Sequence, residues 1–185
     1  VEHDDIRAKF EHTWGVRSLS SQPGLTVTDM IIAAAKGHLK ALYIMGENPL
    51  LSDPDLNHVE KSLGNLDFMV VQDIFMTETA KLAEVVVPAV SFAEKDGTFT
   101  NTERRVQRIT KAIDPLEQAL PDWKIISDLA TKMGYEMAYE SAEDIFSEMK
   151  TVTPSYAGMS YERIAAQGGL QWPCPTQDHP GTKYL

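Results

Sequence analysis

The polar residues best placed to bind a ligand directly follow two predicted buried strands. Gly46-Glu47-Asn48 follows the apolar run 39–45, and Gln72-Asp73 follows the run 66–71. A glycine lets the backbone approach a ligand, and carboxylate or amide oxygens can accept hydrogen bonds from ribose hydroxyls or from the edge of a guanine base. Each stretch alone also fits an ordinary turn or helix cap. Together they favour a nucleotide-like ligand, because both lie on the same side of one predicted sheet.

A second group of charged residues lies further along the chain. Glu94-Lys95-Asp96-Gly97 and Asn101-Thr102-Glu103-Arg104-Arg105 bring three cations and several amides close together. This grouping favours a local anion site, and the alternative is a solvated loop whose Glu–Arg pairs contribute little to stability. Neither GxGxxG nor GxxxxGK[ST] occurs in the sequence. Ordinary NAD binding and P-loop nucleotide binding are therefore disfavoured.

Histidine and cysteine show no pattern of a metal centre. The histidines have no spacing to carboxylates that resembles a metal site, and we interpret all five as structural: His3, His12, His38, His58 and His179. The single cysteine, Cys174, cannot form an intramolecular disulfide or hold zinc or an iron–sulfur cluster by itself. No activating base accompanies its thiol, so we expect a buried packing residue.

Helices and strands alternate through the first half of the chain and must position these polar stretches. Apolar periodicity predicts helices over 4–14 and 53–63, and another from the cap Thr26 until Gly37. The runs 39–45, 66–71 and 84–87 predict strands, and we expect the first to be a central strand buried on both faces. Thr77 could cap a short helix through residue 83. This order predicts an α/β fold with an open, mostly parallel, doubly wound (Rossmann-like) sheet, which binds ligands at the carboxyl ends of its strands.

The second half of the chain is predicted to be mainly helical. Residues 98–110 form an irregular loop or a hairpin, and Asp114-Pro115 marks a boundary between an α/β region, 1–115, and a smaller helical segment, 116–185. Helices are expected over 122–133, over 141–149 with a Ser141/Asp144 capping pair, and near Ser160. From Gly168 onward we expect an extended tail rich in Gly and Pro.

The composition excludes several classes of protein. With 185 residues, 43% hydrophobic and 24% charged, the chain can form one sizeable core or two small lobes. The 17 basic and 27 acidic residues give a net charge of −10, which disfavours binding to nucleic acid or anionic lipid. No apolar stretch approaches the roughly 20 residues that a membrane span needs. The cysteine usage fits a reducing compartment, and we expect a cytoplasmic location, with a periplasmic parent protein as the alternative.

Four segments, in this order and at this spacing, resemble one enzyme family. They resemble the alpha subunits of formate dehydrogenases, in the dimethyl-sulfoxide reductase family of molybdenum or tungsten enzymes: ALYIMGENPLLSDPDL, VVQDIFMTETAKLAEVVVPAVSFAEKDGTFTNTERRVQR, PDWKIISDLATKMGY and GGLQWPCP. The resemblance runs from about Asp4 to the C-terminus. The GLQWPCP segment favours formate dehydrogenases over nitrate reductases.

The resemblance implies a bis-molybdopterin guanine dinucleotide cofactor carrying molybdenum or tungsten, held by the strand-end loops. Carried over by position, the cofactor contacts fall on eight residues: Gly46, Glu47, Asn48, Gln72, Asp73, Thr77, Lys95 and Asp122. Asp73 and Glu47 would accept hydrogen bonds from guanine or ribose. Lys95 and the amides near Gly97 would serve phosphate or base oxygens, and Asp122 would accept from guanine or pterin nitrogens.

Other parts of a full family member have no counterpart in this sequence. A full member has a cysteine-rich segment for a 4Fe-4S cluster and a cysteine or selenocysteine that binds the metal. Since the chain also begins at Val1 without an initiator Met, we expect a middle fragment that does not oxidise formate alone. Its expected partners are the remainder of the alpha subunit, electron-transfer subunits and the substrate formate. The alternatives are a fragment of a related enzyme such as nitrate reductase, and a stand-alone nucleotide-binding or subunit-interaction domain.

Overall fold

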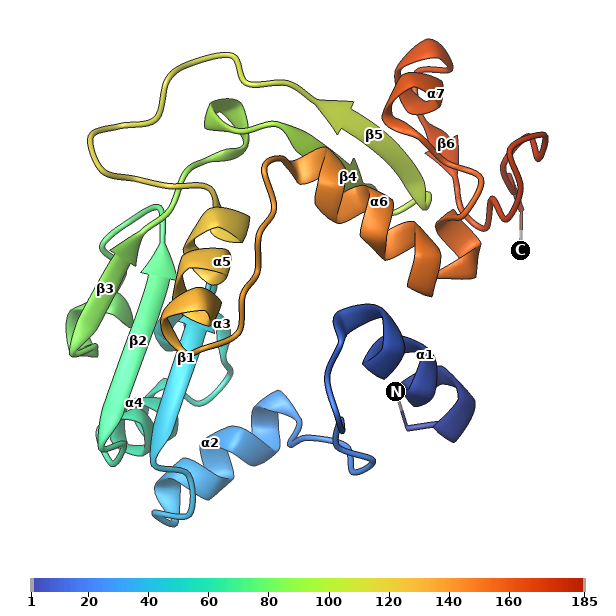
Figure 1. Cartoon of the computed structure of the whole chain (residues 1–185). Coiled ribbons are helices and arrows are strands. Elements are labelled where there is room, and N and C mark those ends of the chain that lie inside the picture. Colours follow the sequence, from blue (N-terminus) through green and yellow to red (C-terminus); the bar gives the residue numbers. More distant parts are fainter. Residues whose placement is uncertain (1, 185) are drawn as a thin grey trace. The chain divides into compact units, whose positions relative to one another are not determined.

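The computed structural model describes residues 2–184, which form two compact units (Figure 1). Unit 2 comprises Pro23–Ser91 and Pro115–Pro121, and unit 1 comprises the other described residues. The units therefore do not coincide with the consecutive regions 1–115 and 116–185. The chain enters unit 2 and leaves it twice, so contiguous sequence cannot delimit either unit. The assignment of 1–115 as a cofactor-binding region stays a prediction.

Unit 2 contains a parallel sheet with the strand order β1-β2-β3. Its strands are β1 (Ala41–Met45), β2 (Phe68–Asp73) and β3 (Val85–Pro88). Ile44 is opposite Val71, and Asp73 is opposite Pro88. The prediction of an α/β fold with a parallel sheet is confirmed. The carboxyl ends of all three strands therefore lie at the same end of the sheet. Gln72 and Asp73 are the last two residues of β2, whereas the sequence had placed them just beyond it.

The first strand corrects an expectation, because β1 lies at the edge of the sheet and buries one face. Ile44 is buried and Leu42 half-buried on the same face, whereas Tyr43 and Met45 are 38% and 49% exposed. A continuous apolar run in the sequence shows that both faces of the strand carry apolar side chains. It does not show whether neighbouring elements cover both of them.

Two helices cover one face of the sheet of unit 2, α2 (Val27–Ala35) and α4 (Leu56–Leu63). They pack on the Ile44 face of the sheet, with a core of Ile31, Ile44, Val59, Leu63, Met69, Val71 and Ala80. The Thr26 hydroxyl accepts a hydrogen bond from the Asp29 N–H at 3.2 Å, which confirms the predicted cap.

The helix predicted over 53–63 forms as α4, which begins at Leu56, and a separate short helix that was not expected, α3 (Pro49–Ser52), precedes it. Asp53 is extended, with ψ of 147°, because it precedes Pro54 and the proline ring disfavours a helical conformation there. The Asp55 carboxylate then caps α4 by accepting from the His58 N–H at 3.1 Å.

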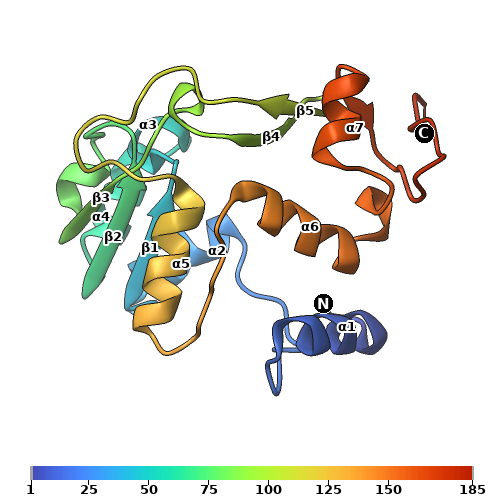
Figure 2. The same ribbon diagram turned by 45° about the horizontal axis from the view of Figure 1, so that its top comes forward.

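Unit 1 contains an antiparallel sheet with the order β4-β5-β6. The hairpin of β4 (Gly97–Thr100) and β5 (Arg105–Ile109), side by side in Figure 2, confirms the hairpin alternative for 98–110. The short strand β6 (Leu170–Gln171) was not expected, since two residues show no periodicity. A second core contains Val106, Phe146, Met159, Tyr161, Ile164, Leu170 and Cys174. Cys174 is fully buried there, as predicted.

The helices of unit 1 are α1 (Asp4–Trp14), α5 (Asp122–Lys132), α6 (Ala142–Val152) and α7 (Tyr161–Ala166). The predicted Ser141/Asp144 capping box is present, and the Ser160 hydroxyl caps α7. Single 3-10 turns are η1 (Ala80–Leu82) in unit 2, and η2 (Phe92–Glu94) and η3 (Pro154–Tyr156) in unit 1. Among the described residues, none of the helices has the length and apolar character needed to span a membrane.

Candidate functional site

Six of the eight predicted cofactor contacts lie at the carboxyl ends of β1 and β2 or in the loops that follow. Gly46 directly follows β1 and has a φ of 64°, a left-handed conformation that favours glycine, and its N–H donates to the Gln72 carbonyl at 2.9 Å. A Cβ at Gly46 would meet no atom within 4 Å. The backbone at this edge is therefore open to a ligand.

Asn48 joins the loop after β1 to the loop after β2. Its Oδ1 accepts hydrogen bonds from the Thr79 N–H at 3.3 Å and the Thr79 hydroxyl at 2.7 Å. Its Nδ2 donates to Glu78 Oε2 at 2.9 Å, and this bond is the main reason why the pKa of Glu78 lies below its usual value. The sequence did not single out Thr79 and Glu78, although they stand in the TETA segment directly after Met76.

Glu47 presents an exposed carboxylate beside this junction. Its Oε2 accepts a weak hydrogen bond from the Ser52 hydroxyl at 3.4 Å. Thr77 has a clear structural contact, since its hydroxyl accepts from the Ala80 N–H at 3.1 Å. Thr77 thus makes a capping-type hydrogen bond, but the residue directly before η1 is Thr79, and the segment is the single turn η1 and not a helix through residue 83.

The Asp73 carboxylate caps a turn with one of its two oxygens. Oδ1 accepts from the Ile74 N–H at 2.7 Å and from the Phe75 N–H at 3.1 Å. The turn cap that the sequence offered as the alternative is thus present, and it leaves Oδ2 for a ligand donor. Gln72 is fully buried, and its Oε1 accepts from the Tyr43 hydroxyl at 2.5 Å. Its cofactor role stays a prediction, like those of the other seven residues.

The remaining two predicted contacts, Lys95 and Asp122, lie in unit 1 and pair with each other. Lys95 Nζ is 2.5 Å from Asp122 Oδ2, and the two side chains are 20% and 33% exposed. Both line a cavity of about 280 Å³ whose wall also includes Thr98 and Trp123. A partly buried lysine beside a carboxylate offers both a donor and an acceptor to a polar ligand.

Arg104, one of the three cations in the predicted anion group, has an internal role. Its guanidinium donates to the carbonyl oxygens of Trp172 and Thr182 and lies 5.7 Å from the centre of the Trp172 ring. Arg105 lies 3.8 Å from Glu103. Arg104 therefore anchors the C-terminal segment to the hairpin, which local sequence could not indicate because its partners lie about 70 residues away.

The strand-end site offers hydrogen-bond acceptors and open backbone, which suits a ligand rich in hydroxyl and amine donors. Within residues 2–184, no three His, Cys, Asp or Glu side chains are grouped so as to hold a metal ion.

Comparison with known proteins identifies relatives of the whole chain. The family described as molybdopterin oxidoreductase matches residues 8–132. The alpha subunit of F420-dependent formate dehydrogenase from Methanocaldococcus jannaschii is 56% identical over 178 residues, covering 95% of this chain and 26% of that protein. Formate dehydrogenase H from Escherichia coli is 42% identical over 181 residues, covering 97% of this chain and 25% of that protein.

A solved structure shows the same fold. Acetylene hydratase from Pelobacter acetylenicus superposes with a TM-score of 0.64 at 23% identity, covering 92% of this chain and 24% of that chain. The chain thus spans about a quarter of the length of these relatives.

Proposed function

Because this chain belongs to the molybdopterin oxidoreductase family, we propose that it is the part of a formate dehydrogenase alpha subunit that holds a guanine dinucleotide end of the cofactor. The observation that carries this proposal is the 56% identity to a formate dehydrogenase alpha subunit across 95% of the chain. Membership of the family implies a molybdopterin cofactor. The guanine dinucleotide and the choice between molybdenum and tungsten belong to the proposal.

The described residues fit such a group. Two acceptors lie at the carboxyl end of the parallel sheet, where ligands of such folds bind: the exposed Glu47 carboxylate and Asp73 Oδ2. The backbone at Gly46 is open there and leaves space for a ligand. Asp73 and Glu47 would accept from ribose hydroxyls or guanine nitrogens. In unit 1, Lys95 would donate to a phosphate or base oxygen, and Asp122 would accept from a guanine or pterin nitrogen.

The bound cofactor would supply the metal centre at which formate is oxidised to carbon dioxide, releasing one proton and two electrons. A 4Fe-4S cluster held outside this chain would pass the electrons to partner subunits. The role of this chain in that reaction is to bind the nucleotide and hold it in a fixed orientation.

Replacement of Asp73 in the complete alpha subunit tests the site. Asp73→Asn keeps an oxygen for the Ile74 and Phe75 N–H groups but places an amide NH2 donor where the second acceptor was. We expect molybdopterin content to fall while the unfolding temperature of the cofactor-free protein stays unchanged. Asp73→Ala should lower both, since loss of a cap costs about 1 kcal/mol.

Asp67→Asn is the matched control, because Asp67 directly precedes β2 and so lies at the amino end of that strand, away from the proposed site. It should leave the cofactor content unchanged. If both Asp73 variants retain full molybdopterin and full turnover, Asp73 is only a turn cap and the proposed site is wrong.

A further inference from the structure

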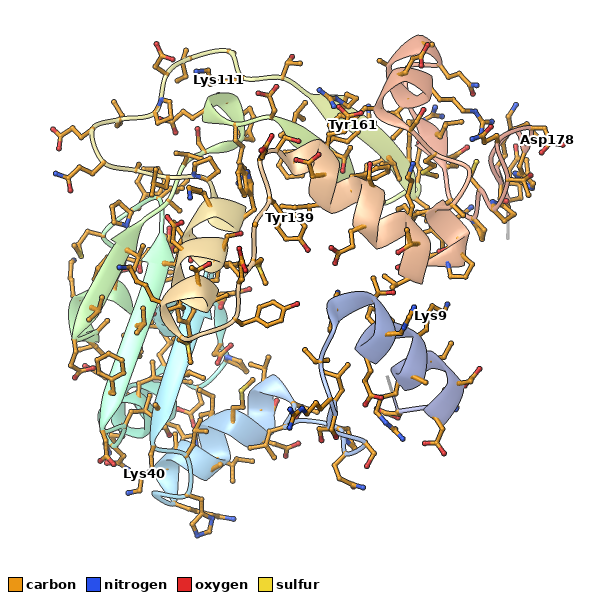
Figure 3. All side chains as sticks on the ribbon, in the orientation of Figure 1. Lys9, Lys40, Lys111, Tyr139, Tyr161 and Asp178 are labelled. Atoms are coloured by element: carbon orange, nitrogen blue, oxygen red, sulfur yellow. The ribbon has the colours of Figure 1, made fainter. Side chains whose placement is uncertain are left out.

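Thr79 is a fully buried polar residue that lies behind the strand-end site and is not among its eight predicted cofactor contacts. It follows β2 and directly precedes the turn η1, so it belongs to the carboxyl end of the sheet. Lys40, labelled in Figure 3, directly precedes β1 at the opposite end. Because buried polar groups in folded proteins are hydrogen-bonded, the partners of Thr79 show what it holds in place.

The partners of Thr79 belong to the loop that follows β1. Its hydroxyl accepts from the Leu50 N–H at 3.2 Å and donates to Asn48 Oδ1 at 2.7 Å, and its N–H donates to the same Oδ1 at 3.3 Å. An N–H can only donate, and a hydroxyl has a single hydrogen. The bond from Leu50 therefore leaves the hydroxyl hydrogen for Asn48. Thr79 thus presents two donors to the Asn48 amide.

These two donors determine which way the Asn48 amide faces. Only the amide oxygen can accept from Thr79, so the NH2 group lies on the other side, where it donates to Glu78 Oε2 at 2.9 Å. The reversed amide would place its hydrogens against those of Thr79 and its oxygen against the Glu78 carboxylate. All three hydrogen bonds would then be lost, and unmade bonds of buried groups cost free energy. The loop after β2 therefore holds the amide in one orientation.

This orientation leaves one hydrogen of the Asn48 amide for a ligand. Asn48 Nδ2 carries two hydrogens, and within residues 2–184 its hydrogen-bond partner is Glu78 alone. Asn48 is half-buried and directly follows the exposed Glu47. The site thus combines a donor at Asn48 with the acceptors at Glu47 and Asp73. A guanine nucleotide has oxygen atoms that can accept from such a donor, besides the hydrogens that the carboxylates can bind.

We propose that Thr79 is a positioning residue for the cofactor, which fixes the Asn48 amide so that its second Nδ2 hydrogen donates to an oxygen of the guanine nucleotide. The inference rests on the proposed function, under which the nucleotide binds at this end of the sheet. Thr79 acts through Asn48, because it is fully buried and its hydroxyl and N–H are bonded within the protein.

Release of the nucleotide from the loaded, complete alpha subunit tests the role of Thr79. Thr79→Val keeps the shape of the side chain and removes the hydroxyl that bonds to Asn48 and Leu50. We expect the nucleotide, measured as guanine per subunit after gel filtration at successive times, to leave at least tenfold faster. Thr79→Ser restores the hydroxyl and should return the release rate to within twofold of the wild type.

Ser62→Ala is the matched control for the loss of a buried hydroxyl. Ser62 is 1% exposed and also belongs to unit 2, but its hydroxyl donates to the His58 carbonyl within α4 at 2.7 Å. This variant should lower the unfolding temperature and leave the release rate unchanged. It therefore separates a general loss of stability from an effect on the nucleotide.

The double variant Asn48→Asp with Glu78→Gln tests the donor itself. Position 48 still accepts from Thr79, and the bond between positions 48 and 78 persists with its donor and acceptor exchanged. The net charge of the pair stays the same, but an oxygen replaces the NH2 group that faces the nucleotide. We expect release at least tenfold faster with an unchanged unfolding temperature.

A wild-type release rate in Thr79→Val or in the double variant would overturn the inference, as would a fast Thr79→Val that Thr79→Ser does not rescue. The nucleotide is bound in each of these cases, so the proposed function would stand. If Thr79→Val does not fold, the double variant alone decides. A wild-type subunit that folds and contains no guanine nucleotide overturns the proposed function instead.

Discussion

At the scale of single residues, Asn48 has the clearest structural role at the strand-end site. Its amide makes three hydrogen bonds to Thr79 and Glu78 in the next loop. Asn48→Ala removes them and leaves the N–H and the hydroxyl hydrogen of the buried Thr79 without their acceptor, so we expect a loss of about 1–3 kcal/mol in the free energy of unfolding. Urea unfolding measures this loss, and a change below about 0.5 kcal/mol would show that other contacts hold the two loops.

The same substitution should change the acid dependence of stability. The Asn48 amide lowers the pKa of Glu78 below its usual 4.5, so ionised Glu78 stabilises the fold above that pH. This contribution disappears as the pH falls through the lowered pKa of the folded protein. Asn48→Ala should therefore show a shallower loss of stability below about pH 4.5. Glu78 is exposed, so high salt should weaken the effect.

Tyr139 should govern stability at alkaline pH. Burial and its hydrogen bond to Glu148 raise its pKa from 10.0 to about 12, so the fold favours the protonated phenol. The stabilisation is complete below pH 10 and disappears as the pH rises towards about 12. Absorbance at 295 nm should show this late titration, which Tyr139→Phe should remove. Tyr184→Phe, at an 89% exposed position, is the control and should leave the late titration of Tyr139 in place.

At the scale of elements, β1 offers a direct test of its one buried face. Ile44 is 7% exposed and belongs to the core of unit 2, so Ile44→Ala should lower the free energy of unfolding by about 2–5 kcal/mol. Met45→Ala, at the 49% exposed neighbour, should cost under about 1 kcal/mol. Equal effects in chemical denaturation would show that β1 buries both faces in solution.

The elements that sequence predicted best are those that local chemistry determines. The caps at Thr26 and Ser141 form with residues three positions away, so their signals are contained in four residues. The burial of β1 and the pairing of β6 depend on distant residues, and local periodicity could not indicate them. The break between α3 and α4 could have been predicted, because Pro54 restrains the preceding residue.

The candidate site shows the same difference between features that local sequence determines and contacts that depend on distant residues. Strand ends are visible in sequence as polar residues after apolar runs, which is how Gly46 and Asp73 were found. Their bonding partners are not visible, because the contacts of Asn48 with Thr79 cross 31 positions of the chain. The pairing of Lys95 with Asp122 spans 27 positions and depends on the fold of unit 1.

At the scale of the whole molecule, the proposed role of the chain is to bind the cofactor, with the metal ligands supplied from outside it. Residues 2–184 contain no cluster of three potential metal ligands, and the only thiol is buried. We therefore predict that the 185-residue chain, purified alone, binds no iron or molybdenum and shows no formate-dependent dye reduction. Elemental analysis checks this, and stoichiometric metal in the purified chain would contradict it.

The formate dehydrogenase assignment can be tested on the complete alpha subunit that contains this chain, with viologen dyes as artificial electron carriers. We predict that formate reduces oxidised viologen and that nitrate does not reoxidise the reduced dye, because the 56% identical relative is a formate dehydrogenase alpha subunit. A cofactor-loaded subunit that reduces nitrate and does not oxidise formate would contradict the account.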